Sequence, residues 1–526
     1  MVNRFKYKYF FGIKKKHILI LFPFLIIGGI LTAEALIILF MNHGLFLYTL
    51  DDPYIHLALA DHIMQGHYGI NHVEASSPSS SMIWPILLAP WVPLVGSFAP
   101  ILLNVITTIA LIPVLGSYLD RIGLAVQGTS HSGIMVCGII VMTNVIGLTF
   151  TGLEHVLQVF CAVLVVKGVV QELEAGYCAS WFLAALVMGP LIRYESLAIT
   201  VPVSLYCVVR GHGRLTLSAC GVTLSMLFAF SIFLHSLGLN WLPSSVLAKA
   251  VPVTQSSTII GILGHLKEKL ATPPALFLMT MVVGLGLAAL QRGRNKAERS
   301  LAISGASSGL LHLFFGEFGW YHRYEIYMVI YCLLLTLYIW RKSIAYLLSS
   351  RPLVREMMVA CCISVSVMSG YIGVLFTTPL ASHNIYGQQY QMRRFAHHFL
   401  KAPFAVNDLG LAAYRSPYYV LDLWGLGSFE AISHRRNRDE PNWMAKLARR
   451  HGVQVAIIYD VWFSGKVPQQ WQRLARLSVE GPNIVLGNKI VDFYVTNPSY
   501  QAHVVNALRD FRSTLPKGSR LELVAH

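Results

Sequence analysis

The feature that most constrains this sequence is a series of apolar runs long enough to cross a lipid bilayer. The first extends from Ile18 to Phe40, and a helix needs about 20 apolar residues to span the hydrocarbon core. The further single runs lie near 132–150, 153–170, 215–237, 271–290, 300–317, 323–340 and 356–377. Because only helices or closed barrels can span a bilayer, this pattern predicts an α-helical polytopic membrane protein.

The composition excludes the main soluble classes. The chain of 526 residues is 55% hydrophobic and 13% charged, whereas soluble proteins carry about 25% charged residues. The formal net charge is +16, which in a soluble protein would suggest nucleic-acid binding. Here the basic residues fall in short loops between apolar runs, so the charge indicates membrane orientation, and we expect no nucleic-acid partner.

The basic loops predict the orientation of the runs. The basic N-terminus precedes the first run, and further basic clusters lie at 210–214, 292–299 and 341–355, all of which we expect to face the cytoplasm. Two longer apolar stretches, 81–119 and 178–209, each allow one or two crossings. A cytoplasmic start and an outside end require an odd total, so we expect about 11 transmembrane helices, with one of the two stretches crossing twice.

The two halves of the chain differ in character, which predicts a membrane module over 1–377 and an extracytoplasmic domain over 378–526. Short β-branched runs alternate with helical stretches after about Ser382, which predicts a soluble α/β domain with a largely parallel sheet. The expected strands are Ala405–Val406, Tyr419–Leu423, Val453–Tyr459, Ile484–Leu486 and Ile490–Val495. The expected helices are Gln388–Leu400, Trp443–His451, Gln469–Leu477 and Tyr500–Phe511.

The first outside loop, residues 41–80, contains an acid pair that could carry chemistry. Asp51 and Asp52 directly precede Pro53, a residue suited to the first turn of a helix. We expect an amphipathic helix after Pro53, lying on the outer face of the membrane. One acid could simply cap that helix, but a cap does not explain two acids with His56 close by, and ionisable clusters at membrane boundaries mark functional sites.

Five short segments of the sequence resemble one family. They are Asp51-Asp52-Pro53-Tyr54-Ile55-His56-Leu57, Gly66-His67-Tyr68-Gly69, Thr151-Gly152-Leu153-Glu154-His155, Leu242-Pro243-Ser244-Ser245-Val246-Leu247-Ala248-Lys249 and Asn407-Asp408-Leu409-Gly410. Together they resemble the GT-C glycosyltransferases, polytopic enzymes that use polyprenyl-phosphate-linked sugars. The bacterial cell-envelope members, arabinofuranosyl- and mannosyltransferase-like, are the most similar in these motifs; Ser244 replaces their usual Asn.

The resemblance implies an enzyme in a bacterial inner membrane. It implies a polyprenyl-phosphate sugar as donor, a glycan, lipid or protein as acceptor, and inversion of configuration at the sugar. An acid of the first loop would serve as general base. We expect Asp51 in that role with Asp52 orienting it, although the reverse order is equally compatible. Two adjacent carboxylates could also hold a divalent cation such as Mg²⁺, Mn²⁺ or Ca²⁺.

Transfer from a lipid phosphate also requires cations for the departing phosphate. The candidates for this role are Arg323, His322, Lys249 and Arg193. Arg323 is the leading candidate because it interrupts an apolar run, whereas Lys249 could be an interfacial anchor. His56, Glu154 and Tyr321 are expected to position the acceptor or a loop, and Glu154 faces the outside only if 178–209 crosses twice.

Two alternatives accompany this interpretation. Asp408 and Asp422 stand at expected strand ends, where acids usually cap the following turn, so we expect them to be structural. The rival function is a transporter or flippase for a lipid-linked envelope precursor, which would favour charges near the middle of the membrane and two related halves. No such internal symmetry is visible in the sequence.

Overall fold

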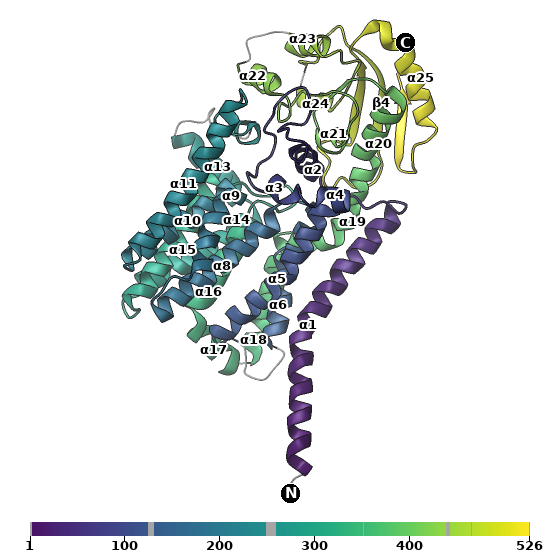
Figure 1. Cartoon of the computed structure of the whole chain (residues 1–526). Coiled ribbons are helices and arrows are strands. Elements are labelled where there is room, and N and C mark those ends of the chain that lie inside the picture. The colour runs from purple at the N-terminus through teal and green to yellow at the C-terminus, as the bar shows by residue number, and fades with distance from the viewer. Residues whose placement is uncertain are drawn as a thin grey trace.

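The computed structural model describes residues 3–124, 131–248, 259–350, 352–437, 442–463 and 465–524. The N-terminal part is helical, and a small domain with a mixed sheet covers one end of it, opposite the N-terminus (Figure 1). The helices of the N-terminal part are α1 (Asn3–Met41), α2 (Asp52–Ile63), α3 (Trp84–Leu88), α4 (Val92–Val95), α5 (Ala99–Arg121), α6 (His131–Met142), α7 (Val145–Thr151), α8 (His155–Ala175), α9 (Ser180–Ile192), α10 (Leu197–Val209), α11 (Gly213–Ser236), α13 (Ile259–Leu270), α14 (Pro273–Leu290), α15 (Lys296–Phe315), α16 (Ile326–Ile339), α17 (Arg341–Ser350), α18 (Pro352–Met368), α19 (Tyr371–Gly387) and α20 (Gln389–Arg394).

By length and composition, the described residues contain five helices able to cross a membrane, or up to eight if each bent pair is one span. The five are Leu21–Met41, Val92–Arg121, His155–Ala175, Gly213–Ser236 and Pro273–Leu290. The bent pairs are Ser132–Met142 with Val145–Thr151, Ile326–Ile339 with Arg341–Leu347, and Ala360–Met368 with Tyr371–Leu400. This is fewer than the eleven crossings expected, partly because α9 and α10 are only 13 residues each.

The stretch 178–209 runs along the bundle as α9 and turns back as α10. Glu172, near the end of α8, accepts a 2.5 Å hydrogen bond from Tyr206 near the end of α10, so α10 ends where α9 begins. By contrast, α5 runs only once, and its last residue, Arg121, pairs with Glu174 at that same end of the bundle, 2.7 Å away. Of the two stretches that the sequence left ambiguous, 178–209 is therefore the one that doubles back.

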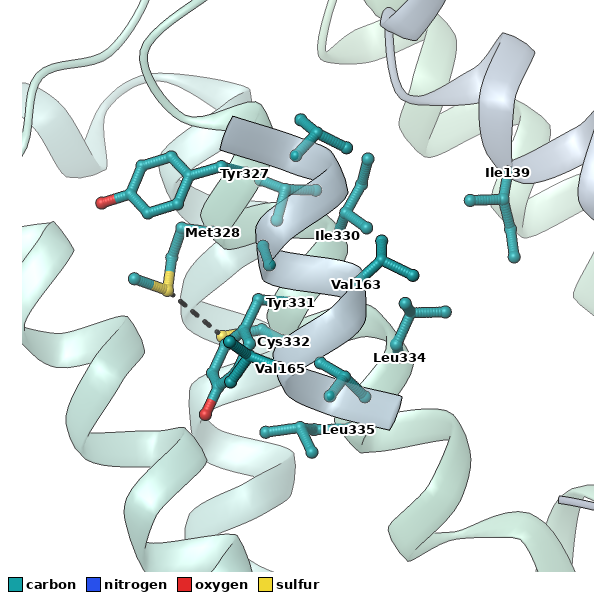
Figure 2. Close-up of a cluster of buried hydrophobic side chains, with 14 of the residues drawn as sticks. Ile139, Val163, Val165, Tyr327, Met328, Ile330, Tyr331, Cys332, Leu334 and Leu335 are labelled. Atoms are coloured by element: carbon teal, nitrogen blue, oxygen red, sulfur yellow. Dashed lines mark hydrogen bonds between the residues drawn. The ribbon is translucent and has the colours of Figure 1, made fainter. Parts of the chain in front are cut away.

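The core of the bundle is built around α16. Nearly all of its side chains are buried, as expected for a helix that is apolar on every face. Figure 2 shows Tyr327, Met328, Tyr331 and Leu335 projecting from it among the surrounding helices, with Val163 and Val165 of α8 nearby. This central helix follows directly after the turn that carries Arg323.

The C-terminal domain contains one six-stranded sheet in the order β2-β1-β3-β5-β4-β6. Its elements are β1 (Phe404–Val406), α21 (Gly410–Ala413), β2 (Val420–Asp422), α22 (Phe429–Asn437), α23 (Trp443–Arg450), β3 (Val455–Ile458), α24 (Asp460–Phe463), β4 (Gln472–Val479), β5 (Ile490–Val495), α25 (Gln501–Arg512) and β6 (Ser519–Leu523). β1 pairs in parallel with β2 and with β3, whereas β3–β5, β5–β4 and β4–β6 are antiparallel. The sheet is therefore mixed rather than largely parallel.

Two of the expected elements in this domain are wrong. Residues 469–477 were expected to be helical because Gln, Arg, Leu and Ala favour helices, but Gln472–Val479 forms β4 between two other strands. Packing against neighbouring strands overrides that local preference. The expected strand Ile484–Leu486 is a loop instead.

The helix after Pro53 is present as α2, but it does not lie on an outer surface. Its residues from Pro53 to Ala60 are all buried, because the C-terminal domain lies over it (Figure 1). The expected amphipathic character is therefore not seen, because both faces of the helix are covered over these residues. The helix instead forms part of the junction between bundle and domain.

The first loop also completes one edge of the sheet. Asn71 donates a 2.9 Å hydrogen bond from Nδ2 to the carbonyl of Val420 and accepts one of 2.9 Å at Oδ1 from the Val420 amide. Val420 opens β2, the edge strand. A side-chain amide thus occupies both backbone groups that a further strand would bind.

Candidate functional site

A cavity of about 290 Å³ lies between the helical bundle and the C-terminal domain. The bundle contributes Asp52, His56, Ser80, His155, Arg193, Trp320 and Arg323 to its lining. The domain contributes Asn407, Asp408, Leu409, Trp424, Leu426 and Trp462. The two walls differ chemically, because both arginines belong to the bundle, whereas Trp424 and Trp462 belong to the domain.

Asp52 and Arg323 form an ion pair at this cavity. Nη1 of Arg323 lies 2.6 Å from Oδ2 of Asp52. The arginine side chain is 7% exposed and that of the aspartate 39% exposed. Nη2 of Arg323 also donates to the Tyr324 hydroxyl at 2.8 Å. A buried guanidinium can bind an anion. The partly exposed carboxylate beside it can accept a proton.

An unusual turn presents Arg323 to the cavity. Gly319, Trp320, Tyr321 and His322 have φ angles of 86°, 43°, 67° and 53°. Three successive non-glycine residues in the left-handed region are each disfavoured by about 1–3 kcal/mol. Such backbone strain concentrates at functional sites, where the surrounding structure holds it in place.

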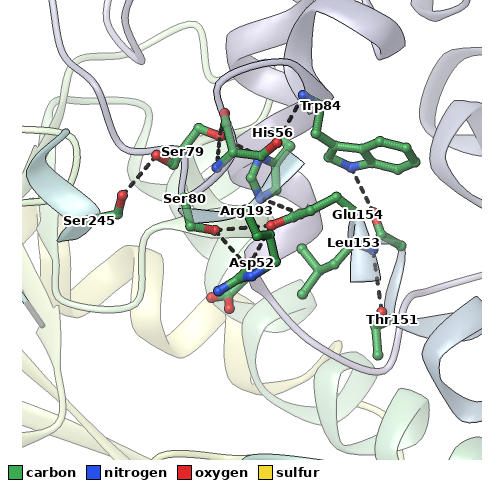
Figure 3. A network of polar contacts seen from close by, with 12 residues as sticks. Asp52, His56, Ser79, Ser80, Trp84, Thr151, Leu153, Glu154, Arg193 and Ser245 are labelled. Atoms are coloured by element: carbon green, nitrogen blue, oxygen red, sulfur yellow. Dashed lines mark hydrogen bonds and ion pairs between the residues drawn. The ribbon is translucent and has the colours of Figure 1, made fainter. Parts of the chain in front are cut away.

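A second buried ion pair, between Arg193 and Glu154, lies at the same cavity, which Arg193 helps to line (Figure 3). Arg193 occupies the break between α9 and α10; its Nη1 lies 2.6 Å from Glu154 Oε1, and its Nη2 lies 2.8 Å from Glu195. Ser80 accepts from Arg193 and donates to Glu154, both at 3.2 Å. This network connects the first loop to the break between α9 and α10. It brings together two of the predicted site residues, Arg193 and Glu154.

Charges in this network hold Glu154 ionised. Burial opposes its ionisation, but the Arg193 guanidinium outweighs burial and keeps the pKa of the carboxyl below its ordinary value. Nε2 of His56 lies 3.7 Å from Glu154 Oε2, and Nδ1 lies 3.0 Å from the Ser79 hydroxyl. Burial nevertheless lowers the pKa of His56, which favours a neutral ring near pH 7.

Asp51 faces the C-terminal domain, not the cavity. Its Oδ1 accepts a 2.8 Å hydrogen bond from the backbone amide of Leu411, and it is 7% exposed. Its side chain therefore caps α21 of the domain instead of its own helix, where it makes no side-chain cap. Burial and the nearby Asp408 carboxylate raise the pKa of Asp51 well above its ordinary range.

Three other predicted site residues do not line the cavity or lie outside the described residues. His322 contacts Glu325 at 3.1 Å and packs edge-on against Tyr371, and it does not line this cavity. Tyr321 hydrogen-bonds Thr378 at 2.8 Å and lines a neighbouring pocket instead. Lys249 lies outside the described residues.

Asp408 and Asp422, which the sequence predicted to be structural acids at strand ends, lie in different settings. Asp408 lines the cavity, where its Oδ2 accepts from Gln389 at 2.8 Å and from Tyr459 at 3.1 Å. The expected capping role holds for Asp422, whose oxygens accept from the amides of Trp424 and Gly427, each at 2.8 Å. Ligands of α/β proteins bind outside the carboxyl ends of parallel strands, and this rule was the signal that could have placed Asp408 at a site and not in a capping role.

The acid pair does not form a divalent-cation site. Asp52 is paired with the guanidinium of Arg323, and Asp51 accepts from a backbone amide. In the part of the chain that the structure describes, no group of three or more His, Cys, Asp or Glu side chains could hold a metal ion. The residues present therefore do not fit a resident cation at this position.

Comparison with known proteins gives one partial match. A family described as a domain of unknown function, DUF8728, matches residues 383–496, from the end of α19 to the residue after β5. This match covers the cavity-facing part of the C-terminal domain and less than a quarter of the chain. No curated protein matches the sequence.

Proposed function

We propose that this protein is a membrane-embedded glycosyltransferase of the GT-C type. It would transfer a sugar from a polyprenyl-phosphate donor to an envelope acceptor at the outer face of a bacterial inner membrane. In this arrangement the N-terminus is cytoplasmic and the C-terminal domain extracytoplasmic. The proposal rests on the resemblance of the first-loop motif, supported by the apolar helices and by the cavity at the end of the bundle.

The observation that carries the proposal is the Asp52–Arg323 pair. A glycosyl transfer needs a carboxylate near the acceptor hydroxyl and a cation near the leaving phosphate. Asp52 and Arg323 supply these two groups 2.6 Å apart at one cavity, and Arg193 adds a second guanidinium to the same wall. A transporter would not require a carboxylate and a guanidinium paired at a cavity beneath a domain.

The roles follow from the chemistry. Asp52 accepts the proton of the acceptor hydroxyl while the oxygen of that hydroxyl forms a bond to the anomeric carbon of the donor sugar. The bond from that carbon to the phosphate oxygen breaks, and the phosphate leaves with the electron pair. Arg323 and Arg193 stabilise its charge. A single displacement of this kind inverts the anomeric configuration.

This proposal assigns the base to Asp52 instead of Asp51. Asp52 lines the cavity and is partly exposed, whereas Asp51 is buried against the domain. Burial of Asp51 favours its neutral form, and a neutral carboxyl cannot accept the proton. Asp51 instead connects the first loop to the domain.

The test is a transfer assay on the full chain in lipid nanodiscs with radiolabelled polyprenyl-phosphate sugars and crude envelope acceptor. Asp52→Asn should reduce turnover at least about a hundredfold, while Asp51→Asn should retain most of it. Asp61→Asn is the matched control, because Asp61 lies on the same helix and pairs with Arg415 away from the cavity. Full activity of Asp52→Asn would refute the assignment, and movement of labelled lipid without any transfer would favour a transporter.

A further inference from the structure

The domain wall of the cavity is formed where three parallel strands end. β1 is followed by Asn407 and Asp408, β2 by Trp424, and β3 by the short helix α24 that carries Trp462. β1 lies between the other two, with β2 on one side and β3 on the other. At such a point the chain connections diverge and leave a crevice at the carboxyl ends, which is where ligands of α/β sheets bind.

The aromatic rings on this wall are held in fixed orientations. The rings of Trp424 and Trp462 are 4.8 Å apart, and Tyr459 lies 5.2 Å from Trp462. The guanidinium of Arg435 lies 3.5 Å from the centre of the Trp424 ring and also donates to the Trp424 carbonyl. Tyr459 is fixed through its hydroxyl, which donates to Gln388 at 2.5 Å. The wall therefore offers a rigid aromatic surface before any ligand arrives.

Beside these rings lies a buried donor that the described residues do not use. Asn407 is 4% exposed and lines the cavity. Its Oδ1 accepts from the Tyr459 amide at 2.8 Å, which identifies Nδ2 as the donor end. In the described part of the chain Nδ2 has no hydrogen-bond partner. A buried polar group without a partner is destabilising by about 1–3 kcal/mol, and a bound ligand can remove that penalty.

These groups together fit one ligand chemistry. A sugar ring has an apolar C–H face that packs on an indole, and hydroxyls that both donate and accept hydrogen bonds. Asn407 Nδ2 offers a donor, and the Asp408 carboxyl offers an acceptor. A hydrocarbon chain would leave both groups unsatisfied. A phosphate, which only accepts hydrogen bonds, would offer no donor to Asp408, and both arginines of the lining belong to the bundle.

We infer that the surface formed by Trp424, Trp462, Asn407 and Asp408 binds the acceptor, and that the acceptor is a carbohydrate. The inference rests on the proposed function, because only a transferase has an acceptor. It places the sugar ring on the domain wall with a hydroxyl toward Asp52. It predicts that a sugar ring, and not a protein or a simple lipid, enters this half of the cavity. The volume of about 290 Å³ lies at the lower end of ligand pockets, which suits one ring of a longer glycan.

Direct binding tests the inference without a donor. Saturation-transfer NMR would be recorded on the full chain in nanodiscs, free of sugar-based detergent, with soluble disaccharides of mannose, arabinose, galactose and N-acetylglucosamine. We expect at least one disaccharide to bind the wild type. Trp424→Ala, Trp462→Ala and Asn407→Asp should each weaken its binding at least about tenfold, which is about 1.4 kcal/mol.

The control is Trp443→Ala, a partly exposed tryptophan of the same domain that stacks on His434 outside the cavity. It should leave saccharide binding unchanged. Asn407→Asp keeps an oxygen that accepts from the Tyr459 amide and replaces the donor NH2 group with a second oxygen, so it reports on binding even if a tryptophan variant fails to fold. Equal binding by wild type and Asn407→Asp would overturn the inference.

The outcome is separable from that of the proposed function. Saccharide binding that depends on Asn407 but without transfer from any donor supports the inference and weakens the transferase proposal. Transfer by the wild type without saccharide binding, and with an unchanged acceptor KM in Asn407→Asp, overturns the inference and leaves the transferase proposal standing.

Discussion

Gly410 lies so close to Asp51 that a Cβ at position 410 would overlap both the carbonyl and the carboxylate oxygens of Asp51. The two residues come from opposite sides of the junction, one from the first loop of the bundle and one from the start of α21. The close approach lets the Leu411 amide reach Asp51 at 2.8 Å. A glycine is required here for space, because Asp51 occupies the volume that any side chain at position 410 would need.

Gly410→Ala is therefore expected to destabilise the junction. The added methyl group must push α21 away from the first loop, and overpacking of this kind costs about 1–3 kcal/mol. Thermal unfolding of the full chain in nanodiscs measures the loss. Gly373→Ala is the control, because a Cβ there meets nothing within 4 Å; equal melting temperatures for the two variants would contradict the prediction.

The buried Asp51 also predicts a pH dependence of stability. Burial and Asp408 raise its pKa in the folded protein, so the folded state binds a proton that the unfolded state releases at lower pH. The stability from this group is complete below its ordinary pKa and is lost as pH rises through the raised value. Asp51→Asn stays neutral, so its melting temperature should rise relative to wild type as the pH increases from about 5 to about 8. A difference that is constant or falls with pH would show that Asp51 is ionised.

The Arg193–Glu154 pair predicts an asymmetric double-mutant cycle. Glu154 is fully buried, while Arg193 retains a partly exposed partner in Glu195. Arg193→Gln leaves a buried carboxylate without its guanidinium and should destabilise by about 3–5 kcal/mol. Glu154→Gln should destabilise less, and the double variant should be more stable than Arg193→Gln alone. Strictly additive changes in chemical denaturation would mean that the two groups are not coupled.

Transfer activity should survive removal of divalent cations. Arg323 already neutralises Asp52 at 2.6 Å, and the described residues offer no cluster for a metal ion. Assaying the wild type before and after excess chelator, followed by dialysis, measures this. Activity that is lost with chelator and restored by Mg²⁺, Mn²⁺ or Ca²⁺ would show that substrate or protein recruits a cation.

The sequence predicted the parts whose signal is local. Runs of about 20 apolar residues identify spanning helices, and the strands at 404–406, 420–422, 455–458 and 490–495 stood out by their β-branched or aliphatic residues. A helix was predicted over 469–477, but residues 472–479 form β4, because only their neighbours in the sheet make them a strand. The composition of this segment does not show that β5 and β6 lie on either side of it.

The site was predicted only in part, for a geometric reason. Consecutive residues at the start of a helix point in different directions, so Asp51 and Asp52 serve different sides of the junction. The sequence shows that both are present but not which one faces the cavity. Asp408 is more than 350 positions away from them, and only the fold brings its carboxyl near theirs.

The pairing of Asn71 with Val420 has a consequence for the domain on its own. An edge strand with free backbone groups is a template for pairing with another chain, and here a side chain from the other half of the protein covers it. A fragment that begins after α19 would lose this cover and the cap from Asp51 at once. The isolated domain should then self-associate through β2. In the full chain the first loop therefore protects the sheet from pairing with another copy.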